Sequence, residues 1–202
     1  KGAALSVTSP VTVAASFGDE FGVMGHQSAA NSITVIDSTA DAAVSVDSTL
    51  LITHPTAASA HQSTFALSLD DTVAGSATVA ALSTFADGDT ILSLITATSP
   101  PGSTLVLGTQ VNLGASTFDD VVLFGNASEV LVSNRSGDAV IHLSGAGLAT
   151  QTTISVGDEP PGMAVDADGH GGEHRHQWVE IQCTPDLRDG LVEPGVWPIM
   201  GR

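Results

Sequence analysis

Four side chains suited to binding a transition metal lie close together near the end of the chain: His170, Glu173, His174 and His176. Imidazole and carboxylate groups are ligands of Zn²⁺, Cu²⁺ and Ni²⁺. In an extended segment His174 and His176 project to the same face, so both imidazoles can bind one ion. The glycine pair before Glu173 would let a third ligand approach. We therefore predict a divalent metal site here, with zinc the best match. A solvated, glycine-rich turn without metal is the alternative.

The same stretch partly matches a calcium-binding loop. Asp166, Asp168 and Gly171 occupy the first, third and sixth positions of the twelve-residue pattern. Its twelfth position is Gln177, which lacks the carboxylate that binds calcium through both oxygens. An Asp-Gly turn that closes a hairpin explains these residues more simply.

The other histidines do not gather into a motif. His26, His54, His61 and His142 are scattered, and the alternation around His142 predicts that it faces solvent from a strand. There is no G-x-S-x-G segment, and Ser, His and Asp are too common for their presence to indicate a triad. We therefore assign no catalytic and no cofactor-binding residue. Whether the protein is an enzyme stays open, with a non-enzymatic role preferred.

Neither the cysteine nor the adjacent acids point to catalysis. Cys183 is the only cysteine, so no internal disulfide and no C-x-x-C motif can form. Its acidic neighbours Glu180 and Asp186 disfavour the thiolate, which predicts an unreactive thiol. Pairs of adjacent acids such as Asp119 and Asp120 would point to opposite faces of a strand, which does not suit shared acid–base chemistry.

The chain is strongly acidic, with 22 Asp and Glu against 5 Lys and Arg and a formal net charge of -17. Such a field repels phosphate backbones and anionic membrane surfaces, which excludes nucleic acid as a partner. No apolar run approaches the roughly 20 residues that a membrane span needs. Because 42% of the residues are hydrophobic, the chain is expected to fold rather than to remain a disordered acidic tail.

Composition also bears on location. Ala, Ser, Thr, Val and Gly dominate and tyrosine is absent, a mixture that is common in exported β-proteins of bacteria and their viruses. The chain starts at Lys1 without an initiator Met or an apolar leader, as a mature or trimmed product would. We predict an extracytoplasmic protein, either secreted, periplasmic, or on a virion or cell surface.

Short segments of alternating apolar and polar residues predict strands along most of the chain. Examples are residues 33–36, 91–95 and 129–132, which are separated by turn-forming clusters of Gly, Asn, Asp, Ser and Pro. Residues 71–85 form the one Ala-rich stretch that could be helical, but β-branched residues dilute it. The sequence therefore predicts an all-β fold.

Three segments look like variants of one repeated unit, residues 31–37, 89–95 and 138–144. Their spacing of roughly 50 residues is near the length of one β-propeller blade. We predict a β-repeat architecture of the propeller kind. A β-sandwich or jelly-roll with an extended C-terminal arm is the alternative.

Residues 130–169 contain, in order, a strand, a Ser133-Asn134-x-x-x-Asp138 turn, a strand, a Gly157-x-x-Pro160 loop, a strand and an Asp168-Gly169 turn. This order resembles the repeat of YVTN-type and lactonase-type β-propellers. The resemblance covers about a fifth of the chain. It implies a propeller-like fold and offers lactonase activity as one functional option. A chain of 202 residues holds four or five blades, whereas lactonase-like enzymes need about seven.

The composition changes near residue 166. Three of the seven histidines, both tryptophans and the cysteine lie in the remaining fifth of the chain. We predict a β-rich domain over residues 1–165 and a C-terminal segment over residues 166–202. This segment would hold a short strand at residues 177–181, and as an arm it could pack on a neighbouring subunit.

Three functions are compatible with these features of the sequence. The first is a non-enzymatic, extracytoplasmic β-repeat binding protein that binds a partner or, through its His-rich segment, a metal. The second is a structural subunit that self-assembles in a virion, filament or surface layer. The third, which rests on the lactonase-type resemblance, is an enzyme.

Overall fold

The computed structural model describes residues 9–15, 21–37, 45–73, 75–124, 127–156, 162–167, 177–182 and 196–197. These residues form antiparallel sheets and two 3₁₀ turns, and none of them lies in an α-helix. The all-β class predicted from the alternation is thus confirmed. Each 3₁₀ turn has only three residues, and no helix in the described part of the chain could cross a membrane.

The first sheet is a meander in which each strand pairs with the next one along the chain. Its strands are β1 (Pro10–Ala15), β2 (Phe21–His26), β3 (Ile33–Asp37) and β4 (Ser45–Leu50). Val23, Ile33 and Val35 are fully buried and face the second sheet. Their spacing follows the period of two that places alternate residues on one face.

The second sheet is also a meander and contains the longest strands. They are β5 (His61–Val73), β6 (Ser76–Phe85), β7 (Thr90–Thr98) and β8 (Leu105–Gly114). The helix considered for residues 71–85 does not form, because residues 71–73 belong to β5 and residues 76–85 to β6. Strand β6 is buried on both faces: Val79 packs toward the first sheet, and Leu82 packs toward the third. A strand buried on both faces loses the clear alternation that marks a strand in sequence.

The third sheet repeats the pattern. Its strands are β9 (Phe118–Phe124), β10 (Glu129–Asn134), β11 (Ala139–Ser144) and β12 (Thr150–Ser155). The 3₁₀ turn η1 (Arg135–Gly137) joins β10 to β11, and η2 (Ala146–Leu148) precedes β12. The Asn134 side chain accepts a hydrogen bond of 3.0 Å from the Gly137 N–H, which closes the first turn.

The last described strands form a three-stranded sheet. They are β13 (Gly162–Ala167), β14 (Gln177–Gln182) and β15 (Val196–Trp197). Strand β14 covers the short strand predicted at residues 177–181. The division of the chain at residues 165 and 166 into two domains stays a prediction.

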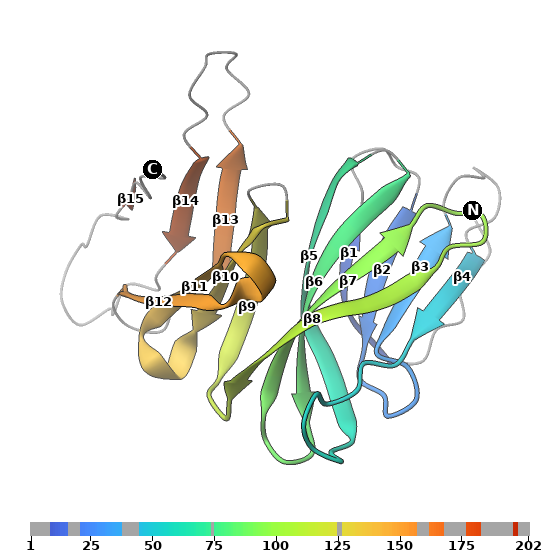
Figure 1. Cartoon of the computed structure of the whole chain (residues 1–202), viewed down its shortest axis with the longest axis horizontal. Coiled ribbons are helices and arrows are strands. Elements are labelled where there is room, and N and C mark those ends of the chain that lie inside the picture. The colour runs from blue at the N-terminus through green and yellow to red at the C-terminus, as the bar shows by residue number, and fades with distance from the viewer. Residues whose placement is uncertain are drawn as a thin grey trace.

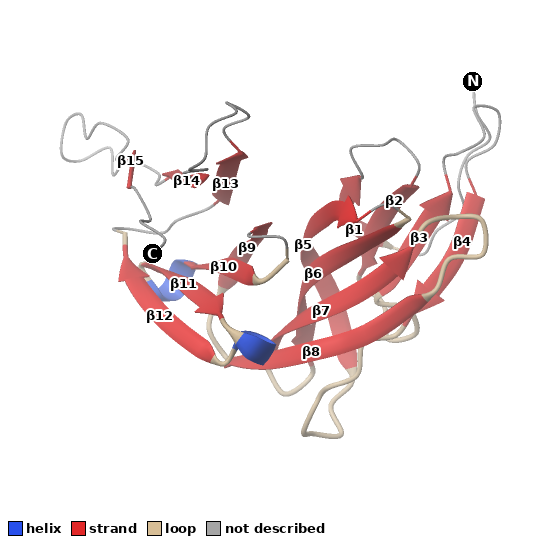
Figure 2. Cartoon of the chain, turned by 45° about the horizontal axis from the view of Figure 1, so that its top comes forward, coloured by secondary structure: helices blue, strands red, loops and turns tan. Residues whose placement is uncertain are grey.

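The sheets follow one another in chain order across the molecule, as Figure 1 shows. The first strand of each sheet contacts the first strand of the next, so β1, β5, β9 and β13 form an inner row. Figure 2 shows that the described sheets make an arc that does not close on itself. Radial repetition of four-stranded meanders around an inner row is the architecture of a β-propeller.

The repeated unit predicted from the sequence has a defined place in this architecture. The three similar segments overlap β3, β7 and β11, and each of these is the third strand of its sheet. An apolar layer lies between each pair of neighbouring sheets, with Phe124 and Met163 contributing to the layer between the third and the fourth.

Polar contacts also join neighbouring sheets. The N–H of Leu123 in β9 donates a 2.9 Å hydrogen bond to the Ser68 hydroxyl in β5, and the N–H of Met163 in β13 donates a 2.8 Å bond to Asp120 in β9. Asp47 of β4 also accepts hydrogen bonds from the N–H groups of Gly102 and Ser103, which lie in the connection from β7 to β8. The Ser103 side chain and these backbone donors hold the pKa of Asp47 below its usual value.

Candidate functional site

The residues predicted to bind metal, His170, Glu173, His174 and His176, lie outside the described residues, so their role stays a prediction. The structure does describe the strands that flank them. Strands β13 and β14 pair antiparallel, and Ala167 faces Gln177 at the end of the ladder. Residues 168–176 therefore connect two paired strands.

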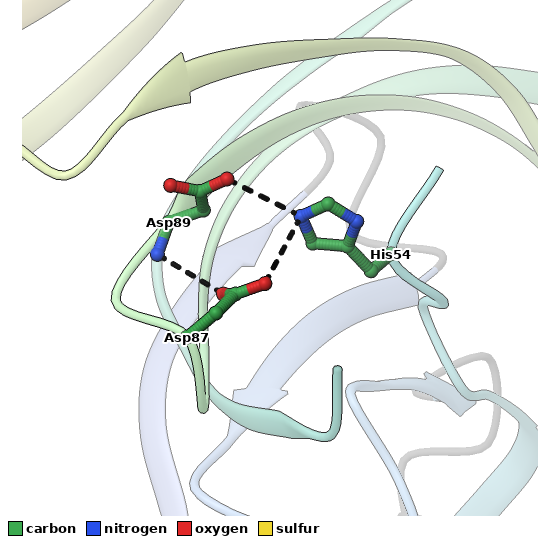
Figure 3. Close-up of side chains that lie close together, drawn as sticks. All are labelled: His54, Asp87 and Asp89. Carbon is green, nitrogen blue, oxygen red and sulfur yellow. Dashed lines mark hydrogen bonds and ion pairs between the residues drawn. The ribbon is translucent and has the colours of Figure 1, made fainter. Parts of the chain in front are cut away.

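A different group of potential ligands comes together between the first and second sheets. His54 lies in the connection from β4 to β5, and Asp87 and Asp89 lie in the turn between β6 and β7. The Nε2 atom of His54 is 3.7 Å from Oδ2 of Asp87 and 3.5 Å from Oδ2 of Asp89 (Figure 3). One ligand atom from each residue lies within 4.8 Å of the other two, so by spacing this group could hold a metal ion.

The imidazole of His54 is buried although both carboxylates reach solvent. Its side chain is 1% exposed, against 35% for Asp87 and 29% for Asp89. The ring meets Phe85 edge to face, with 5.1 Å between ring centroids, and His61 meets the same phenylalanine at 5.6 Å. Phe85 is thus packed against two imidazoles at the edge of the apolar layer between the first and second sheets.

The proton on the His54 ring is placed by the backbone next to it. The N–H groups of Thr56 and Ala57 donate to Nδ1 at 3.2 and 2.8 Å. A nitrogen that accepts hydrogen bonds carries no proton, so the proton of the neutral ring is on Nε2 and points toward the two carboxylates. A metal on Nε2 would have to displace this proton and leave an imidazolate. The hydrogen bonds of the ring therefore favour a His54 whose Nε2–H faces two carboxylates. They disfavour a His54 that binds a metal ion.

Further hydrogen bonds fix the carboxylates. Oδ1 of Asp87 accepts the Asp89 N–H at 3.2 Å, and Oδ2 of Asp89 accepts a 2.6 Å bond from the Asn112 side chain in β8. The Asp87 N–H donates in turn to the Ser59 hydroxyl at 3.1 Å. These bonds fasten the connection between the first two sheets to the β6–β7 turn. The group thus positions one sheet relative to the next.

A second buried histidine, His61, begins β5 and is held in its neutral form. Its Nδ1 donates to the Ser28 carbonyl oxygen at 2.7 Å, and its Nε2 is 3.0 Å from the Thr64 hydroxyl. Thr64 is also 2.9 Å from the hydroxyl of Ser83. Burial, with a smaller contribution from the nearby His26, lowers the pKa of His61, although its bond to Ser28 opposes this shift.

The two other scattered histidines also contact specific side chains. His142 was predicted to face solvent, but its side chain is only 18% exposed, and its Nε2 lies 2.6 Å from Glu129 on the neighbouring strand. Its ring stacks on Phe124 at a centroid distance of 5.8 Å. His26 is buried, with its Nε2 2.7 Å from the Thr34 hydroxyl. The four histidines outside the C-terminal segment therefore take part in packing and hydrogen bonding.

Sequence reasoning missed the group of His54, Asp87 and Asp89. Its members come from a connection and a turn that are distant in the chain, and the segment Asp87-Gly88-Asp89 reads as an ordinary tight turn. No local spacing marks the group, since only the packing of one sheet on the next brings its members together.

No family model matches the chain, and no curated protein does either. Among solved structures, the chain is similar to the periplasmic gluconolactonase of Pseudomonas aeruginosa, with a TM-score of 0.52 at 13% identity. The match takes in 74% of this chain and 40% of that one. A protein of unknown function from Desulfotomaculum acetoxidans matches with a TM-score of 0.39 at 11% identity, over 84% of this chain and 62% of its own.

The chain thus spans well under half of the gluconolactonase that it resembles. At this identity the likeness concerns the fold. The order of the sheets, their inner row of first strands and this likeness agree on a propeller-like, all-β architecture.

Proposed function

We propose that the protein is a non-enzymatic, propeller-type binding protein that works outside the cytoplasm and binds a divalent transition metal through the segment from His170 to His176. The observation that carries this proposal is the pairing of Ala167 with Gln177. The paired strands bring both ends of the histidine-bearing connection together. Less chain entropy is therefore lost when its ligands gather around an ion. Imidazoles at this spacing suit zinc.

The hydrogen bonds of His54 support a binding role for the protein and argue against a catalytic role for this histidine. A general base needs a free lone pair within reach of a substrate proton. In His54, Nδ1 accepts two backbone N–H groups, and the other nitrogen carries the proton and is buried against two acids. This histidine serves the fold and is not available to accept a proton from a substrate.

An extracytoplasmic setting is supported by the resemblance to a periplasmic protein. The acidic surface agrees with a cationic ligand, because a net charge of -17 attracts metal ions and repels phosphate groups.

Zinc titration by calorimetry tests the metal site. We expect one zinc ion to bind per chain and binding to be lost in the double variant His174→Ala with His176→Ala. Affinity should fall below about pH 6 as the imidazoles take up protons. The matched comparison is Asp87→Asn with Asp89→Asn, which removes the other candidate ligands and should bind zinc normally. Loss of binding in the aspartate variant alone would move the site to the group around His54, and no binding by the unaltered protein would remove the metal from the proposal.

The resemblance to a gluconolactonase defines the test of the non-enzymatic part. We expect the purified protein to hydrolyse glucono-δ-lactone no faster than buffer does, with and without added zinc or calcium. An acceleration proportional to protein concentration would instead support the lactonase-like option.

A further inference from the structure

The buried titratable side chains of the described residues are three histidines, His26, His54 and His61. Among them, His61 joins two sheets directly. It begins β5 of the second sheet, and its Nδ1 donates a 2.7 Å hydrogen bond to the carbonyl oxygen of Ser28, in the connection between β2 and β3 of the first sheet. Its ring packs edge to face on Phe85 of β6. One neutral imidazole thus holds this end of the first sheet against the second.

The surroundings of His61 do not suit a positive charge. Burial and, to a smaller extent, the charge of the nearby His26 on β2 lower the pKa of His61. His54 contacts the same phenylalanine, but the acids of the β6–β7 turn, Asp87 and Asp89, pair with His54. Within the described part of the chain, no acid forms an ion pair with His61. A second proton on its ring would therefore be a buried charge without a partner.

Other links between the sheets respond differently to acid. The second and third sheets are joined by an apolar layer and by the bond from the Leu123 N–H to the Ser68 hydroxyl, neither of which contains a titratable group. At the end of β7 that is remote from the β6–β7 turn, Asp47 of the first sheet accepts hydrogen bonds from Gly102 and Ser103. The Ser103 side chain and these two backbone donors lower the pKa of Asp47, so its carboxylate stays ionised in mild acid. Mild acid therefore acts on one end of the contact between the first two sheets.

We propose that proton uptake by His61 opens the contact between the β2–β3 connection and the start of β5, which makes this end of the first sheet an acid-sensitive element of the fold. In the open state the charged ring is solvated and its bond to Ser28 is broken. The contact of Asp47 keeps the remote end of the sheet attached. Below the ordinary histidine pKa of about 6.5, the ratio of open to closed protein should rise by up to about tenfold per pH unit. The rise should end once the closed form also takes up the proton.

Hydrogen exchange of the full chain, read by mass spectrometry between about pH 7.5 and about pH 5, tests this opening. After correction for the intrinsic pH dependence of exchange, amides of the β2–β3 connection should lose protection as the pH falls. One of them is the Ser32 N–H, which bonds to the Leu50 carbonyl oxygen. Amides of β6 should stay protected. A chelator is present throughout, so that loss of metal from the proposed site at residues 170–176 plays no part.

Two results of this measurement would overturn the proposal. If β6 loses protection over the same pH range as the β2–β3 connection, acid unfolds the protein as a whole. If the β2–β3 connection keeps its protection at the lowest pH, the contact at His61 does not respond to acid.

A pair of variants assigns the opening to His61. In His61→Gln the side-chain amide can still donate to Ser28 and accept from Thr64, but it takes up no proton. We expect its β2–β3 connection to stay protected at the acidic end of the range. The control is His142→Gln, which removes a partly exposed histidine of the third sheet and should open like the unaltered protein. Opening of His61→Gln at the same pH as the unaltered protein would exclude His61 as the responsible group.

Nuclear magnetic resonance of the unaltered protein covers the case in which His61→Gln does not fold. The assigned Cε1–H resonance of His61 reports the protonation of the closed form. Exchange of the β2–β3 connection should begin to rise near pH 6.5 and level off near the pH at which this resonance titrates. Exchange that follows a curve unrelated to the His61 titration would contradict the proposal.

Discussion

The N–H of Ala57 donates a 2.8 Å hydrogen bond to Nδ1 of His54. With the similar bond from Thr56, it assigns the ring proton to Nε2 and directs it at the acids of the β6–β7 turn. The buried imidazole thus lies where the β4–β5 connection meets the β6–β7 turn, two segments that the hydrogen bond from the Asp87 N–H to the Ser59 hydroxyl also joins. The stability of this junction should depend on His54 more than on any exposed ion pair.

Replacing His54 with Ala should lower the free energy of unfolding by roughly 2 to 4 kcal/mol, because it leaves a cavity beside Phe85 and two backbone donors without their acceptor. The control is His142→Ala, which removes a partly exposed pair with Glu129 and should cost about 1 kcal/mol or less. Urea denaturation at neutral pH measures both. Equal losses of unfolding free energy in the two variants would show that burial and hydrogen bonding do not distinguish these two histidines.

The lowered pKa of His61 predicts a pH dependence of stability. The histidine of the unfolded chain takes up a proton near its ordinary pKa of about 6.5, whereas the folded protein resists protonation, so the unfolded state binds more protons as the pH falls. Stability from this group is present above about pH 6.5 and is lost as the pH falls through the lower pKa of the folded state. Protonation would also make Nε2 a donor, so that the Thr64 hydroxyl would have to accept from it and turn its own hydrogen elsewhere.

The His61→Gln variant has no side chain at this position that can take up a proton, in the folded or the unfolded state. We expect the free energy of unfolding, measured in urea between about pH 7 and pH 5, to fall less steeply in the variant than in the unaltered protein. Parallel pH profiles for the two proteins would contradict this assignment.

Gly25 marks a close approach of β2 to β5. A Cβ atom at this position would lie 2.7 Å from the carbonyl oxygen of Thr64 and 2.8 Å from Cγ2 of Thr12. Because one of these neighbours is backbone, Gly25→Ala should destabilise the protein by about 1 to 3 kcal/mol.

Gly22→Ala in the same strand is the matched control, since its Cβ would meet only the Ala14 carbonyl oxygen, at 3.5 Å. It should be neutral or slightly stabilising, because alanine narrows the unfolded ensemble. Thermal denaturation of both variants tests the contrast, which fails if Gly25→Ala melts with the unaltered protein.

The acidic surface should make the protein sensitive to salt. With 22 acids and only 5 Lys and Arg, the carboxylates repel one another in the folded state at neutral pH. Raising sodium chloride from about 0.05 to about 0.5 M should therefore raise the melting temperature. A melting temperature that does not respond would mean that the acids are too dispersed to interact.

Local patterns were sufficient to predict much of the fold. Alternation in segments such as β3, with Ile33 and Val35 on one face, identified strands because period two is a property of the chain itself. The similarity of the segments around β3, β7 and β11 indicated the repeat because each occupies the same place in its sheet. The Ala-rich β6 was harder to recognise, since burial on both faces removes the polar half of the pattern.

The described group around His54 could not be predicted in the same way. Its geometry depends on which sheet packs beside which, and on a turn whose residues, Asp87 and Asp89, look like those of any tight turn. Histidines that alternate with apolar residues, as His142 does, were also misleading, because a neighbouring Glu129 and the ring of Phe124 cover a side that the alternation assigns to solvent.

The meander order of the strands has a consequence for synthesis. Each strand of the first three sheets pairs with the strand made just before or just after it, and each sheet rests on the one translated before it. Pairing between consecutive strands keeps the closed loops short, which lowers the entropy lost when each pair forms. The first sheet can thus complete its ladder while the second is still emerging from the ribosome, and every later sheet then finds a finished template to fold against.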